Sequence, residues 1–175
     1  MVIWLTGLSG SGKTTLARAL HELLTPVCKR LVLLDGDAVR EAFGDGLGHR
    51  QEDRIVQVTR VQRIAKLLAD QDLVVIVALV YANADLLHWN RAYIPNYFEI
   101  HVKASFETVA ARDGKGLYRA AQRGEQTDVV GVDIPLWEPT SPDLVIDADH
   151  PEEPVVLARR VASAIPRFAP LVEVG

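Results

Sequence analysis

The residues best suited to chemistry lie near the N-terminus, at positions 7–14, which read GLSGSGKT. This run matches the P-loop pattern, in which glycines allow a tight turn whose backbone N–H groups point at phosphate oxygens. Lys13 would supply a cation for the β- and γ-phosphates of a nucleoside triphosphate, and the hydroxyl of Thr14 suits Mg²⁺. A glycine-rich turn with a surface lysine is the simpler alternative, but a chance match is expected in only about one chain of this length per hundred. The predicted phosphate-binding residues are Gly7, Leu8, Ser9, Gly10, Ser11, Gly12, Lys13 and Thr14.

A second candidate group is the acidic pair Asp35 and Asp37, which follows a short apolar run. Beside a phosphate site, one carboxylate can hold the water shell of Mg²⁺ while the other accepts the proton of an attacking hydroxyl. The next apolar run ends in Tyr81 without an acid, so metal support falls to Asp35 or Asp37. The alternative is an aspartate that caps a helix before a turn glycine. We predict Lys13, Asp35 and Asp37 as catalytic and Thr14 and Asp35 as metal-binding; either acid could be the base.

Basic residues near this pair are candidates for binding an acceptor. Arg40 and Arg54 could each grip a phosphate or sulfate with two parallel hydrogen bonds. His49 lies in a loop that faces the predicted acceptor site. The other four histidines show no metal-ligand spacing, which favours structural or surface roles for them. For Arg60 and Arg63 a solvated helix face explains the charge equally well.

Residues 113–133 form a glycine-rich segment with little periodicity, which we predict to be a lid. Phosphoryl transfer requires that water be excluded, and mobile loops usually do this. Basic side chains of such a lid could close over the phosphates; the candidates are Arg112, Lys115, Arg119 and Arg123. An ordinary charged surface loop is the alternative.

Strand-like and helix-like segments alternate along the chain and must position these residues. The predicted strands are residues 2–6, 31–34, 73–80, 97–102 and 144–146, and the predicted helices are 13–24, 51–70, 84–94, 105–111 and 154–165. This repeated pattern predicts an α/β fold of the P-loop NTPase type, a three-layer α/β/α arrangement with a five-stranded parallel sheet. Ligands of such sheets bind beyond the carboxyl ends of the strands, where both motifs lie.

Size and charge set further limits. The chain has 175 residues, enough for a single domain over 1–175, and a net charge of −4, which argues against a nucleic-acid partner. The longest apolar run, residues 73–82, is about half of what a membrane crossing needs, so we expect no membrane association. Cys28 is the only cysteine, so no intrachain disulfide can form, and we expect a cytoplasmic location.

Taken together, these segments resemble adenylylsulfate kinases, which phosphorylate the 3′-hydroxyl of adenosine 5′-phosphosulfate (APS). The resemblance runs from Val2 to about Asp147. It is densest at residues 7–15, 34–40 (LDGDAVR), 52–54 (EDR), 65–70 (AKLLAD) and 111–118 (ARDGKGLY). The P-loop alone would not name the family, whereas the second and last blocks, in this order, are much more specific.

The resemblance implies roles for particular residues. ATP and Mg²⁺ would form the donor system, with Thr15 in the ATP site and Arg112 near the ATP base. Asp35 and Asp37 would lie at the reacting hydroxyl and the metal, Arg40 and Arg54 at the acceptor, and a lid around Lys115. The partners implied are a small nucleotide acceptor and a second copy of the chain, in a homodimer.

Departures from the family pattern cluster on the acceptor side. The family usually has phenylalanines at the positions of His49 and Val129, and these rings sandwich the acceptor's adenine. It usually has asparagine at the position of Gln57, and Ser-Pro-Tyr-Arg where this chain has residues 81–84 (YANA). Stacking on an aromatic ring contributes about 1–3 kcal/mol per base. The acceptor pocket therefore differs from the family pattern, and Tyr81 is the nearest aromatic residue that could replace the lost stacking. We include Gln57, Tyr81 and His49 among the predicted acceptor-binding residues.

Three hypotheses follow. The first is adenylylsulfate kinase activity, with in-line transfer of the ATP γ-phosphate to the 3′-hydroxyl of APS. The second keeps the donor chemistry but changes the acceptor to another activated nucleotide, such as the CDP-phosphoramidate used by related kinases of capsule pathways. A pyrimidine is smaller, and Gln57 or His49 could read its edge. The third, a module that binds nucleotide without catalysis, does not account for the acids Asp35 and Asp37 beside Lys13.

Overall fold

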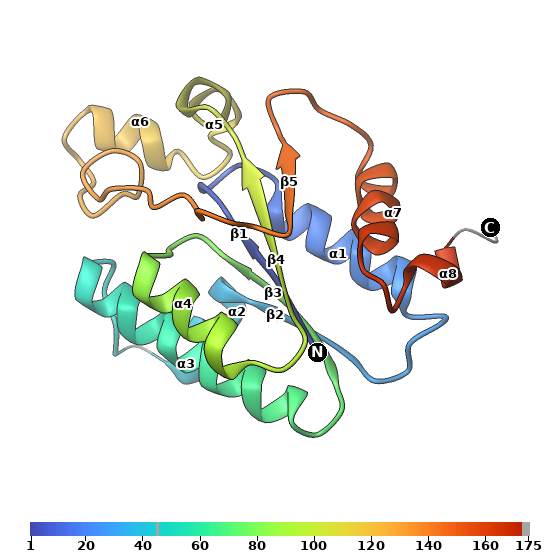
Figure 1. The fold of residues 1–175 in the computed structure, drawn as a ribbon. Coiled ribbons are helices and arrows are strands. Elements are labelled where there is room, and N and C mark those ends of the chain that lie inside the picture. The colour runs from blue at the N-terminus through green and yellow to red at the C-terminus, as the bar shows by residue number, and fades with distance from the viewer. Residues whose placement is uncertain (45, 173–175) are drawn as a thin grey trace.

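The computed structural model describes residues 1–44 and 46–172. Its strands form one sheet in the order β2-β3-β1-β4-β5, in which every neighbouring pair is parallel. Their bounds are β1 Val2–Thr6, β2 Leu31–Asp35, β3 Val74–Leu79, β4 Tyr97–Lys103 and β5 Leu144–Asp147. Because the strands are parallel, their carboxyl ends share one edge of the sheet (Figure 1).

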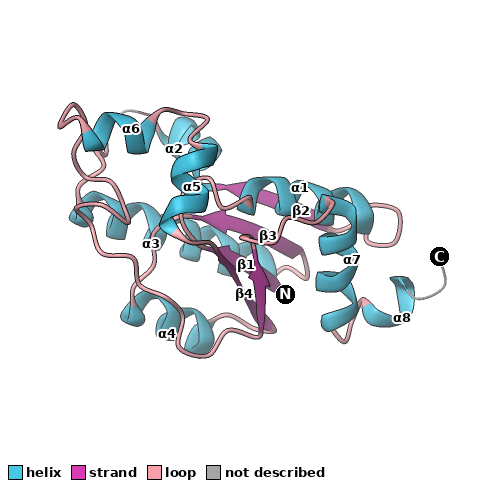
Figure 2. Cartoon of the chain, turned by 90° about the horizontal axis from the view of Figure 1, so that it is seen from above, coloured by secondary structure: helices cyan, strands magenta, loops and turns pink. Residues whose placement is uncertain are grey.

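Helices cover both faces of this sheet (Figures 1 and 2). Along β1 the side chains of Val2 and Trp4 enter one core, and those of Ile3 and Leu5 enter the other. Strand β3 also contributes to both cores, which explains its unbroken apolar run. The first core is closed by α3 Gln51–Ala69 and α4 Ala84–Tyr93, and the second by α1 Lys13–Leu24, α7 Pro154–Ala164 and the segment leading to α8 Ala169–Val172.

The predicted α/β/α architecture is confirmed, and each predicted strand and helix is present within a residue or two of its expected bounds. Three short helices of the described residues were not assigned from the sequence: α2 Gly36–Phe43, α6 Leu117–Gln122 and α8. The buried side of α3 includes two polar residues, Gln57 and Gln62. Gln62 satisfies its amide by donating to the backbone oxygen of Leu86 and to Asn90, so burial there costs no unpaired donor.

The segment predicted as a lid lies at the carboxyl edge of the sheet. It follows α5 Phe106–Arg112 and contains a helix, α6 Leu117–Gln122, where the sequence showed no clear periodicity. Figure 1 shows α5 and α6 together above the ends of the strands, in the yellow part of the chain. Across the described residues, no helix combines the length and the apolar character that a membrane crossing requires.

Candidate active site

The P-loop connects the end of β1 to the start of α1, as expected. Gly10 and Gly12 adopt φ angles of 78° and 97°, in the left-handed region that favours glycine. A side chain at Gly7 would collide with the backbone oxygen of Val102. No side chain caps the N-terminus of α1, so its first N–H groups remain available to a ligand. The backbone is therefore shaped to hold an anion at the positive end of a helix.

Lys13 is the buried cation of this loop, with only 6% of its surface exposed. Its Nζ atom donates to the backbone oxygen of Leu8 at 2.5 Å and to Oγ of Ser11 at 3.5 Å. Lys13 forms no ion pair with any residue in the described ranges. Burial lowers the pKa of Lys13 to about 8, against the opposing pull of Asp35 and Asp37. A buried cation without a carboxylate partner fits an anionic ligand.

The acidic pair lies beside this loop, at the junction of β2 and α2. One carboxylate oxygen of Asp35 accepts from the hydroxyl of Thr14 at 2.9 Å, and the other accepts from the backbone N–H of Asp37 at 3.0 Å. Asp35 is therefore the N-cap of α2 and a neighbour of the P-loop at once. Asp37 is exposed, and its carboxylate receives a hydrogen bond of 2.6 Å from Nζ of Lys115. This hydrogen bond is the main reason why the pKa of Asp37 is lowered.

The two predicted acceptor arginines bind the loop that carries His49. Arg40 donates to the backbone oxygens of Leu47 and Gly48 at 3.0 and 2.9 Å. Arg54 donates through Nε to the backbone oxygen of His49 at 2.8 Å. Burial, followed by the charges of Arg40 and Arg54, lowers the pKa of His49, which favours the neutral form of its ring.

The lid segment is tied to the site at three points. Lys115 reaches Asp37, as described above. Tyr118 of α6 donates to the backbone oxygen of Ser9 in the P-loop at 2.9 Å, and burial raises the pKa of this phenol to about 12. Arg54 donates through Nη2 to the backbone oxygen of Asp128 at 2.7 Å. The structure thus brings lid, P-loop and acidic pair together.

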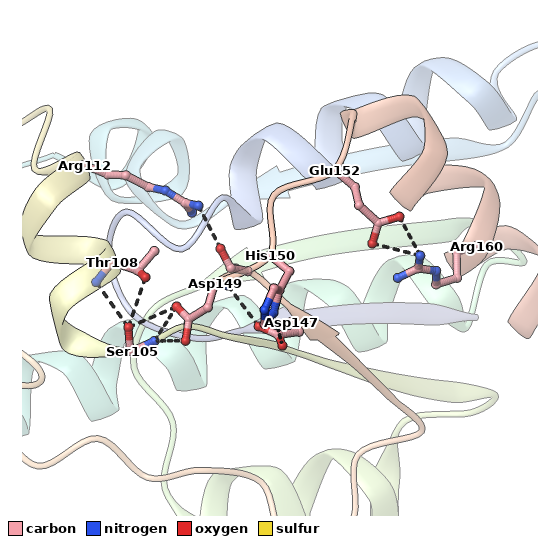
Figure 3. A network of polar contacts seen from close by, with 9 residues as sticks. Ser105, Thr108, Arg112, Asp147, Asp149, His150, Glu152 and Arg160 are labelled. Carbon is pink, nitrogen blue, oxygen red and sulfur yellow. Dashed lines mark hydrogen bonds and ion pairs between the residues drawn. The ribbon is translucent and has the colours of Figure 1, made fainter.

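The other predicted basic residues of this region are engaged elsewhere. Arg119 lies 3.6 Å from the carboxylate of Asp113, and Arg123 lies 2.7 Å from that of Glu125, so both pair within the lid. Arg112 donates to the backbone oxygen of Ala148 at 2.7 Å, in the loop after β5 (Figure 3). The structure therefore separates Arg112 from the acceptor-side arginines and joins it to the opposite flank of the P-loop.

That flank also carries an open cavity of about 510 Å³. It is lined by Leu8 of the P-loop, by the start of α5 and by the returning lid segment 131–136. Asp149 also lines this cavity, and its carboxylate accepts from the backbone N–H and the hydroxyl of Ser105 at 2.9 and 3.0 Å (Figure 3). Of the predicted site residues, only Leu8 lines this cavity.

Sequence reasoning missed three residues that hold the site together. Tyr118 lies in the block ARDGKGLY, but its side chain was not assigned a contact. Asp113 is buried and accepts from the backbone N–H of Arg119 at 3.0 Å, which orients α6. Asp128 accepts a hydrogen bond from Arg54 through its backbone oxygen. Every residue has such an oxygen, so the residue type gives no hint of this contact. The Asp-Gly pair at 113–114, a typical turn signal, was the one available hint for Asp113.

Comparison with known proteins agrees with this arrangement. A family model described as adenylylsulphate kinase matches residues 1–147. The cytidine diphosphoramidate kinase of Campylobacter jejuni is 42% identical over 146 residues, which cover 83% of this chain and 85% of that protein. The adenylyl-sulfate kinase of Deinococcus deserti is 43% identical over 149 residues, which cover 85% and 82%.

A solved structure supports the same conclusion. The APS kinase of Mycobacterium tuberculosis, in complex with AMPPNP and APS, superposes with a TM-score of 0.80 at 31% identity. The superposition covers 93% of this chain and 95% of that one. Because the family model and the relatives both span most of its length, the chain belongs to the adenylylsulphate kinase family of P-loop phosphotransferases.

Proposed function

We propose that the chain transfers the γ-phosphate of ATP to the 3′-hydroxyl of a nucleotide, with APS as the first candidate acceptor. The observation that carries this proposal is Lys13, a buried cation at the positive end of α1 that has no acidic partner among the described residues and lies beside Asp35 and Asp37. Phosphate groups would neutralise this lysine and accept hydrogen bonds from backbone N–H groups of the P-loop, residues 7–15, at the uncapped start of α1.

The two acids are suited to different tasks. The carboxylate of Asp35 is held by Thr14 and by the N-terminus of α2, so it can position a ligand but has little freedom to move. Asp37 is exposed, and its only side-chain partner among the described residues is Lys115. We therefore assign Asp37 as the group that takes the proton of the acceptor hydroxyl. The new O–P bond then forms as the bond from the γ-phosphorus to the bridging oxygen breaks, and ADP leaves.

Mg²⁺ fits the same residues. The described part of the chain holds no group of three or more acidic, histidine or cysteine side chains that could cage a metal. Mg²⁺ usually binds through one or two protein oxygens, several waters and the substrate phosphates. The Thr14 hydroxyl and the Asp35 carboxylate, which lie 2.9 Å apart, would supply those oxygens. The bound ion would neutralise charge on the phosphates.

The acceptor-side residues also admit a second candidate, a cytidine diphosphate derivative. His49 and Val129 stand where the resemblance expects stacking rings, and Val129 is 1% exposed, inside the core. An aliphatic side chain offers no π-face to a purine. The relative from Campylobacter jejuni is named as a cytidine diphosphoramidate kinase. Both candidates use the same donor and the same hydroxyl chemistry.

Steady-state kinetics with ATP against a panel of nucleoside 5′-phosphosulfates and cytidine diphosphate derivatives tests this proposal. We expect phosphorylation of at least one member, with APS as the reference. If APS is turned over with a low-micromolar KM, the idea of a rebuilt pocket is wrong. Binding of ATP with no phosphoryl transfer to any member would contradict the proposal and revive the non-catalytic module.

The pKa of Lys13 predicts how nucleotide affinity depends on pH. In the nucleotide-free protein this pKa is about 8, and bound phosphates would raise it, so binding takes up a proton above pH 8. We expect the affinity for a non-hydrolysable ATP analogue to fall by up to about tenfold per pH unit above pH 8. Calorimetric titration between pH 7 and 9.5 measures this. Lys13→Arg, which stays charged, should flatten the profile; a flat wild-type profile would contradict the role of Lys13.

Three broader expectations remain proposals. We propose that residues 1–175 form one domain in which residues 113–133 act as the lid, that the protein forms a homodimer, and that it works in the cytoplasm. The shared cores of the sheet support the first, and the family resemblance supports the second. Sedimentation equilibrium of the full chain would measure the oligomeric state directly.

A further inference from the structure

The tip of the P-loop is in contact with the two helices that follow β4. A Cβ atom at Gly10 would lie 3.5 Å from the backbone oxygen of Val109 in α5, so the two backbones are close together. The backbone oxygen of Ser9 accepts a hydrogen bond of 2.9 Å from the hydroxyl of Tyr118 in α6. The second contact has a direction, and it joins the phosphate-binding loop to the lid segment.

The side chain of Tyr118 is held in the orientation that this hydrogen bond needs. It is 1% exposed, and its ring packs edge-on against that of Phe106, with the ring centroids 5.3 Å apart. Burial raises the pKa of the phenol to about 12, so it remains protonated near neutral pH. A backbone oxygen can only accept, so the hydroxyl is the donor. The carbonyl of Ser9 therefore points towards Tyr118.

The orientation of this carbonyl also sets the direction of the next N–H. All peptide bonds of the described residues are trans, and in a planar trans peptide the C=O and N–H bonds point in opposite directions. The N–H of Gly10 therefore points away from Tyr118. Gly10 is exposed, and no acceptor in the described part of the chain takes its N–H. This N–H is available to a phosphate oxygen.

A glycine at position 10 leaves this orientation open unless another group fixes it. Rotation of the peptide between Ser9 and Gly10 would change φ of Gly10, which is 78° here. Glycine tolerates φ angles of either sign, so the rotated loop would meet little steric resistance. A single hydrogen bond shifts such an equilibrium by about tenfold. The hydroxyl of Tyr118 is thus able to decide between the two orientations.

We propose that Tyr118 is a positioning residue for the donor nucleotide: its hydroxyl holds the carbonyl of Ser9, so that the N–H of Gly10 faces the phosphates. This inference rests on the proposed kinase function. Lys115, three residues before Tyr118, pairs with Asp37. One short stretch of the lid segment therefore joins the phosphate-binding loop to the acidic pair. Because coupling between binding and conformation is reciprocal, bound phosphates would in turn stabilise the contact of α6 with the P-loop.

The first test removes only the hydroxyl. Tyr118→Phe keeps the ring against Phe106, and we expect the Kd of a non-hydrolysable ATP analogue with Mg²⁺ to rise about tenfold. The KM of the acceptor at saturating ATP should not change. Replacement of Tyr118 by 4-aminophenylalanine, which keeps a donor at the same position, should restore the affinity. Tyr93→Phe, at an exposed tyrosine of α4, is the matched control and should bind like the wild type.

A second measurement follows the lid segment itself. Amide hydrogen exchange of α6 should become about tenfold slower in the wild-type protein when the ATP analogue is bound, because the bound phosphates stabilise the contact between Tyr118 and Ser9. The analogue should have little effect on this exchange in Tyr118→Phe at the same degree of saturation. The wild-type arm of this measurement does not depend on whether a variant folds.

The possible outcomes separate this inference from the proposed function. If the wild-type protein does not bind the ATP analogue, the proposed function itself fails. If Tyr118→Phe binds the analogue as tightly as the wild type, or if the analogue does not slow exchange of α6 in the wild type, the function stands and the inference is wrong. Loss of affinity that 4-aminophenylalanine does not restore, or an equal loss towards the acceptor, would show that the hydroxyl has a structural role only, which also overturns the inference.

Discussion

Replacement of Lys13 by methionine is expected to lower kcat/KM by about 10³-fold or more, while the protein remains folded. The side chain of Lys13 is the buried cation that would neutralise charge on the transferred phosphate. Methionine has a similar length, so the cavity left behind is small. Single-turnover kinetics would show the loss in the transfer step, because the other N–H groups of the P-loop still bind nucleotide.

The same substitution should make the nucleotide-free protein at least as stable. A pKa of about 8 for a lysine means that its charge costs the folded state about 3 kcal/mol at pH 7. This folded-state pKa lies below that of the unfolded chain, so the unfolded state binds more protons between pH 8 and about 10.5. Wild-type stability should therefore rise over this range relative to Lys13→Met.

Thermal unfolding of both proteins across that pH range measures the effect. Lys29→Met, at an exposed lysine beyond α1, serves as the control and should alter neither activity nor stability. A Lys13→Met protein that keeps wild-type turnover would exclude the proposed site. One that unfolds outright would show that Leu8 and Ser11 depend on the lysine for structure.

The Asp37→Asn variant is expected to lower kcat by about 10²–10⁴-fold with little change in the KM for ATP. The amide preserves the shape of the side chain but cannot accept the hydroxyl proton. Asp37 is exposed and caps no helix, so its replacement should not affect stability. Product formation from a saturating acceptor, measured at fixed ATP, gives the effect on kcat.

The control for this variant must also lose an exposed ion pair. Asp70→Asn is suitable, because the Lys66–Asp70 pair has the same length, 2.6 Å, as the Lys115–Asp37 pair. Asp35→Asn provides the comparison at the site, since asparagine caps a helix as well as aspartate. Near-normal turnover of Asp37→Asn together with a large loss in Asp35→Asn would assign the base to Asp35 instead.

Much of the fold could be predicted from the sequence because the signals are local. The apolar runs at β1 and β3 have no alternation, which only a sheet covered on both faces explains. The P-loop run requires a strand before it and a helix after it. Helix α6 was not predicted because its six residues are too few to show a periodic pattern. Hydrogen bonds of Asp113 and Tyr118 to other parts of the chain stabilise it.

The sequence by itself predicted the P-loop and the acidic pair beside it, and it indicated the family, since each depends on residues that are close in the chain. Only the tertiary structure distinguished Asp35 from Asp37, joined Lys115 to Asp37 across 78 positions, and left the polar atoms of Gln57 and Tyr81 unpaired in the interior. The physical reason is that pKa, burial and hydrogen bonding depend on neighbours in space. Parallel strands bring such neighbours together from distant parts of the chain.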